Sequence, residues 1–96
     1  NSDNGNAYML LGNIYASVEN FGENDLENKA VYWIAVDYYK KAKQVDPSLK
    51  DKANKQIDAY KQYFPDKETI FFHGKELGGS YNLGGWINET TTVRKK

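Results

Sequence analysis

Apolar side chains recur at helical spacing in three stretches of the chain. Residues three or four positions apart share one face of an α-helix, so each stretch predicts an amphipathic helix. The helix expected over residues 6–20 carries Tyr8, Leu11, Ile14, Tyr15 and Val18. The helix expected over residues 29–45 carries Val31, Ile34, Ala35, Tyr38, Tyr39, Ala42 and Val45. The helix expected over residues 47–63 carries Leu49, Ala53, Ile57 and Tyr60, with Phe64 just beyond it.

Turn-forming residues separate these helices. Residues 1–6 (NSDNGN) lack periodicity and predict a disordered terminus, and residues 21–28 (FGENDLEN) predict a loop or a loosely helical extension. Asp46 and Pro47 end the second helix, because the residue before a proline avoids the α region and proline suits the first turn of the next helix. Pro65 ends the third helix.

After Pro65 the sequence predicts only short elements. Residues 66–73 (DKETIFFH) can form one helical turn that directs Ile70, Phe71 and Phe72 into the core. The predicted segments are a terminus over 1–6, a helix pair with an enlarged connection over 7–47, a capping helix and short turn over 48–73, and a glycine-rich tail over 74–96.

The tail predicts a short β-hairpin. Gly84-Gly85 lies between residues 81–83 and 86–88, which matches a two-residue hairpin turn, and residues 86–93 are rich in β-branched and aromatic types. Because an isolated hairpin is only marginally stable in water, we expect it to lie on the helices or to pair with the edge of another chain.

Composition sets the size and class of the protein. Its 96 residues correspond to one small domain, and 40% hydrophobic with 15% aromatic residues is too apolar for a disordered chain. No run approaches the roughly 20 apolar residues of a membrane span. There is no cysteine for a disulfide or a thiolate metal site. The chain begins without methionine, which predicts a fragment or a processed product.

The charges balance overall but not along the chain. The 13 basic and 13 acidic residues cancel, which argues against nucleic acid as the main partner. Residues 1–28 hold five acidic and no basic residues, whereas residues 29–96 hold 13 basic and eight acidic ones, so the two parts carry −5 and +5. This polarity favours contact between the two parts, within or between molecules, over nucleic-acid binding; simple solvation is the alternative.

The first two helices match a known repeat pattern. The tetratricopeptide repeat reads W-x2-L-G-x2-Y, then A-x3-F and a terminal proline. The matching residues here are Tyr8, Leu11, Gly12 and Tyr15, then Ala35, Tyr39, Ala42 and Pro47. On these residues the chain resembles a tetratricopeptide-repeat protein over about residues 6–63, with tyrosine at both aromatic positions. Small residues allow the helices to approach closely, and aromatic side chains fill the gap between them.

The resemblance implies a mainly α fold: an antiparallel helical hairpin, a capping helix and a short β-hairpin tail. The span from Tyr8 to Pro47 is too long for a repeat of about 34 residues. The excess lies between Tyr15 and Ala35, so either the helices are longer or the loop is enlarged. The third helix lacks the L-G-x2-Y motif and is typical of the cap that ends a repeat array.

The sequence of the tail suggests where in the cell the protein is located. Residues 78–94 (GGSYNLGGWINETTTVR) are similar to the ending of a group of bacterial tetratricopeptide-repeat proteins of the cell envelope. This resemblance implies a periplasmic or envelope location, with the cytoplasm left open, and the C-terminal end of a longer repeat protein. A fragment with so few repeats can form a homodimer to cover its open face.

The sequence offers little for catalysis. His73 is the single histidine and is more typical of a capping or packing residue than of a general base. Glu23, Asp25 and Glu27 lack the spacing of a calcium loop, and the glycine pairs lack the context of a phosphate-binding loop. We therefore expect no enzyme activity, no cofactor and no metal.

A non-catalytic module that binds a protein or peptide is the leading interpretation. The first helix lines the concave face of such repeats. The expected partner-binding residues are Tyr8, Asn13, Ala16, Ser17, Asn20 and Trp33. The aromatic cluster around Trp33 contacts the third helix or the tail, or else lines a groove for a partner. The alternative function is an envelope-associated carbohydrate-binding or enzyme-accessory domain that uses exposed Trp33, Trp86 and tyrosines as stacking platforms.

Overall fold

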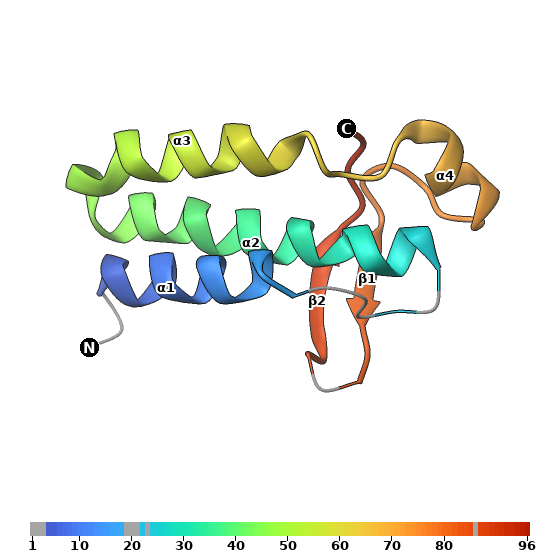
Figure 1. The fold of residues 1–96 in the computed structure, drawn as a ribbon, viewed down its shortest axis with the longest axis horizontal. Coiled ribbons are helices and arrows are strands. Elements are labelled where there is room, and N and C mark those ends of the chain that lie inside the picture. The colour runs from blue at the N-terminus through green and yellow to red at the C-terminus, as the bar shows by residue number, and fades with distance from the viewer. Residues whose placement is uncertain (1–3, 19–21, 23, 86) are drawn as a thin grey trace.

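The described residues form a layer of helices crossed by a C-terminal hairpin. The computed structural model describes residues 4–18, 22, 24–85 and 87–96. The elements in chain order are α1 (Gly5–Ala16), α2 (Asp25–Val45), the 3-10 turn η1 (Pro47–Leu49), α3 (Lys50–Lys61), α4 (Lys67–Phe72), β1 (Ser80–Leu83) and β2 (Glu89–Thr92). α2 lies between α1 and α3, and the hairpin lies across α2 (Figure 1). The expected mainly helical fold with a short antiparallel hairpin is confirmed.

Asparagine and aspartate side chains cap the N-termini of α1, α2 and α4. The Asn4 side chain accepts from the Ala7 amide at 3.3 Å, Asn24 accepts from the Glu27 amide at 2.9 Å, and Asp66 accepts from the Thr69 amide at 2.8 Å. The caps at Asn24 and Asp66 satisfy amides of the first helical turn that lack an intrahelical carbonyl, and the Ala7 amide also donates to the Asn4 carbonyl at 3.2 Å. The hydrogen bond donated by the Thr69 amide also holds the pKa of the Asp66 carboxyl below its ordinary value.

Both ends of the first helix differ from the prediction. Gly5 belongs to α1, so the expected disordered terminus over residues 1–6 is wrong at this residue, whereas Asn6 is helical as the predicted helix over residues 6–20 requires. Gly5 is buried, and a Cβ atom there would lie 2.7 Å from Cδ1 of Leu49, so only glycine lets α1 begin against the α2–α3 corner. The helix ends at Ala16 because the Ser17 amide turns back to the carbonyls of its last turn.

The second helix begins earlier than predicted. α2 has 21 residues and starts at Asp25, within the segment expected to be a loop or a loosely helical extension. The Asn24 cap, and burial of Leu26 at 2% exposure, compensate for the polar sequence of this first turn. The extra length between the repeat-like positions therefore lies partly in a longer second helix.

The apolar residues of the third predicted helix are buried as expected. Ala53, Ile57 and Phe64 are buried, and Leu49 and Tyr60 are packed against the core. The predicted helix is divided, however: η1 covers the first residues, and the Asp46 carboxylate accepts from the amide and hydroxyl of Ser48. This local bonding favours a tight turn before α3 begins.

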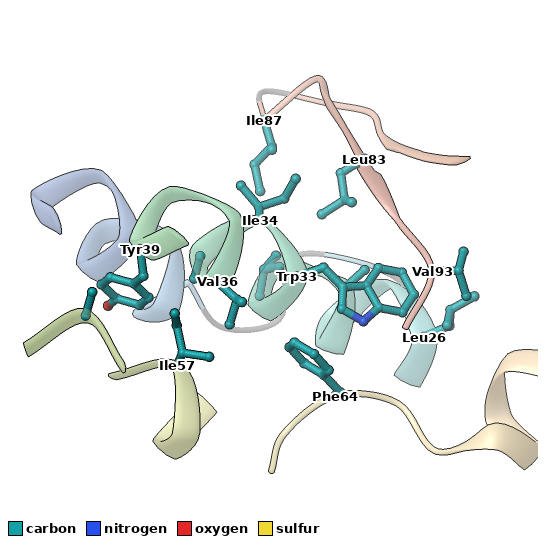
Figure 2. Close-up of a cluster of buried hydrophobic side chains, with 14 of the residues drawn as sticks. Leu26, Trp33, Ile34, Val36, Tyr39, Ile57, Phe64, Leu83, Ile87 and Val93 are labelled. Carbon is teal, nitrogen blue, oxygen red and sulfur yellow. The ribbon is translucent and has the colours of Figure 1, made fainter. Parts of the chain in front are cut away.

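The hydrophobic core surrounds α2. Because α1, α3 and the hairpin each pack on it, α2 is buried around most of its circumference from Ala30 to Val36. Figure 2 shows α2 side chains meeting Ile57 and Phe64 on one side and Leu83, Ile87 and Val93 on another. The aromatic cluster of the second helix is thus wide because α2 has three neighbours, which confirms contact with the third helix and the tail.

One close approach sets the distance between α1 and α2. A Cβ atom at Gly12 would lie 2.6 Å from Cε1 of Tyr39 and 2.8 Å from Cδ1. The Tyr39 ring is buried, stacks on Tyr60 with 6.1 Å between ring centroids, and donates its hydroxyl to Oδ1 of Asn13 at 2.6 Å. The expectation that Gly12 permits close packing is confirmed.

The short fourth helix buries fewer side chains than predicted. Ile70 is fully buried, but Phe71 and Phe72 are 51% and 85% exposed, so their expected place in the core is wrong. A six-residue helix presents a single narrow face to its neighbour, and Ile70 occupies that face.

The hairpin has a longer connection than predicted. Leu83 pairs with Glu89 and Ser80 with Thr92, so residues 84–88 connect the strands and the expected two-residue turn is wrong. Gly85 and Asn88 adopt positive φ angles of 61° and 42° in this connection. The strand expected over residues 86–88 instead begins at Glu89. Trp86 lies outside the described residues.

Candidate functional site

Three tyrosines stack between α1 and α2. The ring of Tyr38 lies parallel to those of Tyr8 and Tyr15, with centroid distances of 6.3 and 5.5 Å. The ammonium of Lys41 lies 5.1 Å from the centroid of Tyr8, which adds a cation–π contact at the outer end. We refer to Tyr8, Tyr15 and Tyr38 as the tyrosine stack.

Glu89 joins the tyrosine stack to the hairpin. The hydroxyl of Tyr15 donates to Oε2 of Glu89 at 2.6 Å, and that of Tyr38 donates to Oε1 at 2.7 Å. The bond to Glu89 and burial raise the pKa of Tyr15 to about 12, and burial with the same carboxylate raises the pKa of Tyr38. Both hydroxyls therefore remain protonated donors at neutral pH. They serve as anchors for β2, and a proton-abstracting role would require the opposite shift.

A second polar cluster lies beside the first. Arg94 donates from Nη2 to Oδ1 of Asp37 at 2.8 Å, to Oγ1 of Thr91 at 3.0 Å and to the Trp33 carbonyl at 3.0 Å. Thr91 in turn donates to Oδ2 of Asp37 at 2.5 Å. Alternation along β2 brings Glu89 and Thr91 to the face that covers α2, and Val93, directly after the strand, is buried as well. These bonds hold the tail in place.

A small pocket opens between the two clusters. It has a volume of about 210 Å³ and is lined by Ile34, Asp37, Tyr38, Lys41, Glu89 and Thr90. The Tyr38 hydroxyl already donates to Glu89, and the Asp37 carboxylate already accepts from Thr91 and Arg94. The polar groups of this pocket are therefore used in attaching the hairpin.

The expected partner-binding residues of the first helix have different surroundings. Tyr8 is half-buried within the tyrosine stack, and Ala16 is half-buried against the core. Asn13 and Ser17 are exposed, although Asn13 accepts from Tyr39 and the Ser17 hydroxyl donates to the Ile14 carbonyl at 2.7 Å. Asn20 lies outside the described residues.

Trp33 is not on the surface. Its side chain is 0% exposed, its Nε1 donates to the Arg94 carbonyl at 2.8 Å, and Tyr81 meets it edge-on at 5.7 Å. The expectation of an exposed Trp33, as a partner-binding residue or as a stacking platform, is wrong. The tail covers this side chain, and the helical pattern alone could not reveal that cover.

α1 instead exposes an apolar stripe that the sequence pattern assigned differently. Leu10 and Ile14 are 60% and 46% exposed, although Ile14 was expected to face the core. These two residues and Ala7 share one face of α1 with the exposed polar residues Asn6, Asn13 and Ser17. We call these six residues the α1 outer face. Helical spacing alone did not identify this face, because exposed Leu10 directly follows buried Met9 and both residues are apolar.

Across the part of the chain that the structure describes, no three histidine or acidic side chains gather as metal ligands do. His73 directly follows α4, and the Phe72 ring packs edge-on against it at 5.2 Å. Glu23 lies outside the described residues.

The fold and the site define a small, mainly helical protein whose C-terminal antiparallel hairpin is anchored on its central helix. No family model, curated protein or solved structure matches the chain. Among the described helices, none has the length and apolar character needed to cross a membrane.

Proposed function

We propose that this chain is a non-catalytic protein-interaction module of tetratricopeptide-repeat type, forming the C-terminal end of a longer repeat protein. Its partner is a protein or peptide, or an adjacent repeat, that packs on the α1 outer face. A periplasmic or envelope location belongs to the same proposal and is supported only by the resemblance of the tail.

The contrast between the two outer helices carries the proposal. α1 exposes Leu10 and Ile14, whereas the solvent side of α3 carries the charged and polar residues Lys50, Asp51, Lys52, Lys55, Asp58 and Gln62. A terminal repeat needs one polar face toward water and one face that continues the stack. This helical layer has that asymmetry.

The inner side of α1 makes its outer face rigid. The tyrosine stack fixes α1 on α2, and the Tyr39 hydroxyl holds the Asn13 side chain from below. A docking helix or extended peptide would bury Leu10 and Ile14 and meet Asn13 and Ser17 as polar neighbours. A preorganised surface of this kind loses little conformational entropy on binding.

Site-specific photo-crosslinking tests the proposal. A benzophenone amino acid placed at Leu10 or at Ile14 should give a discrete crosslinked species in cells that express the full protein. The same probe at Lys55, on the solvent side of α3, is the control and should give none. Mass spectrometry of the crosslinked species identifies the partner. Analytical ultracentrifugation of the purified chain shows whether that partner is a second copy of the same chain.

A reverse pattern would contradict the proposal. If positions 10 and 14 yield no more crosslinked product than position 55, the α1 outer face is not a docking surface. The variant Leu10→Lys with Ile14→Lys should abolish the complex, while Leu77→Lys, which changes another exposed apolar residue, should leave it intact.

A further inference from the structure

A pocket of about 270 Å³ opens on the side of the molecule away from the tyrosine stack, where α2, α3 and residues 94–95 meet. Four cationic residues contribute to its lining: Lys40, Lys61, Arg94 and Lys95. The apolar residues of the pocket are Val36, Ile57 and Phe64, and Figure 2 shows Val36 of α2 near Ile57 of α3.

The positive charge of this pocket is only partly compensated by the protein. Asp37 is the carboxylate that acts on Lys40, and it already forms an ion pair with Arg94 at 2.8 Å. Lys40, Lys61 and Lys95 form no ion pair with any described residue. Four cationic residues thus line this pocket, and Asp37 is the carboxylate that acts on two of them, Lys40 and Arg94.

Two further observations concern Lys40 and Arg94. Burial and then the charge of Arg94 lower the pKa of Lys40, and Lys43 and Lys61 act in the same direction. The guanidinium of Arg94 cannot turn away, because it is bonded to Asp37, Thr91 and the Trp33 carbonyl and lies 5.5 Å from the Phe64 ring centroid. One cation of the pocket is therefore fixed in place before a ligand arrives.

We propose that this pocket binds an oxyanion group, either phosphate or carboxylate, between Lys40, Lys61 and Lys95, with the fixed charge of Arg94 behind it. An anion in this position relieves the repulsion among the cations and forms charge-assisted hydrogen bonds with the three ammonium groups. The apolar residues exclude water from one side of the site, which strengthens these interactions. The site is independent of the α1 outer face.

The test titrates the 96-residue chain with inorganic phosphate and, separately, with acetate, at a constant ionic strength held with sodium chloride. Backbone NMR shifts and calorimetry report binding. We expect saturable shifts at residues 40, 61, 94 and 95 and a dissociation constant of about 1 mM or lower for at least one anion. Comparison of the two titrations distinguishes a phosphate site from a carboxylate site, and either result supports the proposal.

Paired charge variants supply the control. The double variant Lys40→Gln with Lys61→Gln should weaken binding by about tenfold or more, because it removes two charged donors. The double variant Lys52→Gln with Lys55→Gln loses the same net charge from the solvent side of α3 and should change the affinity less than about twofold. Circular dichroism confirms that each variant is folded.

Two results would overturn the site. One is equal anion affinity in the two double variants, because the loss of affinity would then depend only on the net charge of the protein. The other is the absence of saturable binding of both anions to the unsubstituted chain. A third readout is the side-chain titration of Lys40 followed by NMR: bound anion should raise its pKa, and an unchanged titration at saturating anion counts against contact with Lys40.

Discussion

At residue 12, the space for a side chain is occupied by the ring of Tyr39. The ring cannot move aside without losing its stacking on Tyr60 and its hydroxyl bond to Asn13. Two effects of alanine at this position oppose each other: better helix propensity, worth about 1 kcal/mol, and overpacking, which costs about 1–3 kcal/mol. Because the ring is held at its face and at its hydroxyl, overpacking should prevail.

The substitution Gly12→Ala should therefore lower the free energy of unfolding by up to about 2 kcal/mol. Urea denaturation followed by circular dichroism measures this change. Gly84→Ala is the matched control, since a Cβ atom at Gly84 meets no atom within 4 Å. A stability equal to that of Gly84→Ala would show that the Tyr39 ring yields to the new methyl group.

The effect of Glu89 on the pKa values of Tyr15 and Tyr38 can be tested by substitution. Its hydrogen bond is the main cause of the raised pKa of Tyr15, whereas burial is the main cause for Tyr38. The substitution Glu89→Gln should lower the pKa of Tyr15 toward 10 and change that of Tyr38 less. NMR titration of the tyrosine rings distinguishes the two, and Glu76→Gln, at an exposed site, should leave both unchanged. Equal shifts at Tyr15 and Tyr38 would contradict this assignment of causes.

At the scale of elements, the hairpin depends on side chains more than on its own strands. Its two strands have four residues each, and a two-stranded sheet of that size is unstable alone. Leu83, Ile87 and Val93 contribute buried surface, and Glu89, Thr91 and Arg94 contribute hydrogen bonds to α2 and α1. Detaching one of these anchors should loosen the hairpin before it affects the helices.

The substitution Arg94→Gln tests this order of stability. It removes the ion pair with Asp37 and the bond to the Trp33 carbonyl, so amide hydrogen exchange in β1 and β2 should accelerate about tenfold or more. Exchange in the centre of α1 should stay within about twofold of its original rate. Lys95→Gln is the neighbouring control. Uniform acceleration through all elements would instead show that the hairpin and helices unfold as one unit.

The sequence predicts these elements to different degrees, for physical reasons. The three helices could be predicted because their apolar stripes repeat over several turns, and Asp46-Pro47 marks a boundary. The start of α2 could not, because the polar run before Lys29 is stabilised by the Asn24 cap and by burial of Leu26. The hairpin was predictable from its glycines and β-branched residues, but its register depends on which residues, such as Glu89, meet α2.

The candidate site was predicted less well than the fold. Helical spacing indicates which residues share a face, but not which element covers that face. Trp33 is covered by the tail, while Leu10 and Ile14 are uncovered in the described structure. The basic pocket brings Lys40 and Lys61 together with Lys95 from a distant part of the chain. Which distant residues meet depends on the path of the tail over the helices, and no periodic pattern in the sequence indicates that path.

At the scale of the whole molecule, the buried tyrosines couple stability to alkaline pH. The pKa values of Tyr15 and Tyr39 are raised to about 12 in the folded protein, from 10.0 when unperturbed. Between these values the unfolded state has lost protons that the folded state still holds, so stability falls as pH rises. Below pH 10 the contribution of both hydroxyls is fully present.

We therefore expect the urea midpoint to remain steady from about pH 7 to 9 and to fall as pH rises from about 10 toward 12. Urea denaturation followed by circular dichroism at each pH measures this midpoint. Lys52→Gln, which removes one exposed lysine, is the control and should show the same decline with pH as the unsubstituted protein. Glu89→Gln should make the decline shallower, because it brings Tyr15 nearer to its unfolded pKa. A decline as steep in that variant as in the unsubstituted protein would show that other groups dominate.

The cover over Trp33 has a consequence for synthesis. The residues that meet there, Trp33 and Arg94, are 61 positions apart. At a translation rate of about 5–20 residues per second, roughly 3–12 s pass between their appearances from the ribosome. During this interval the flank of α2 that later meets the tail is exposed to chaperones and to other nascent chains. The period of greatest aggregation hazard for this protein thus falls before the hairpin is made.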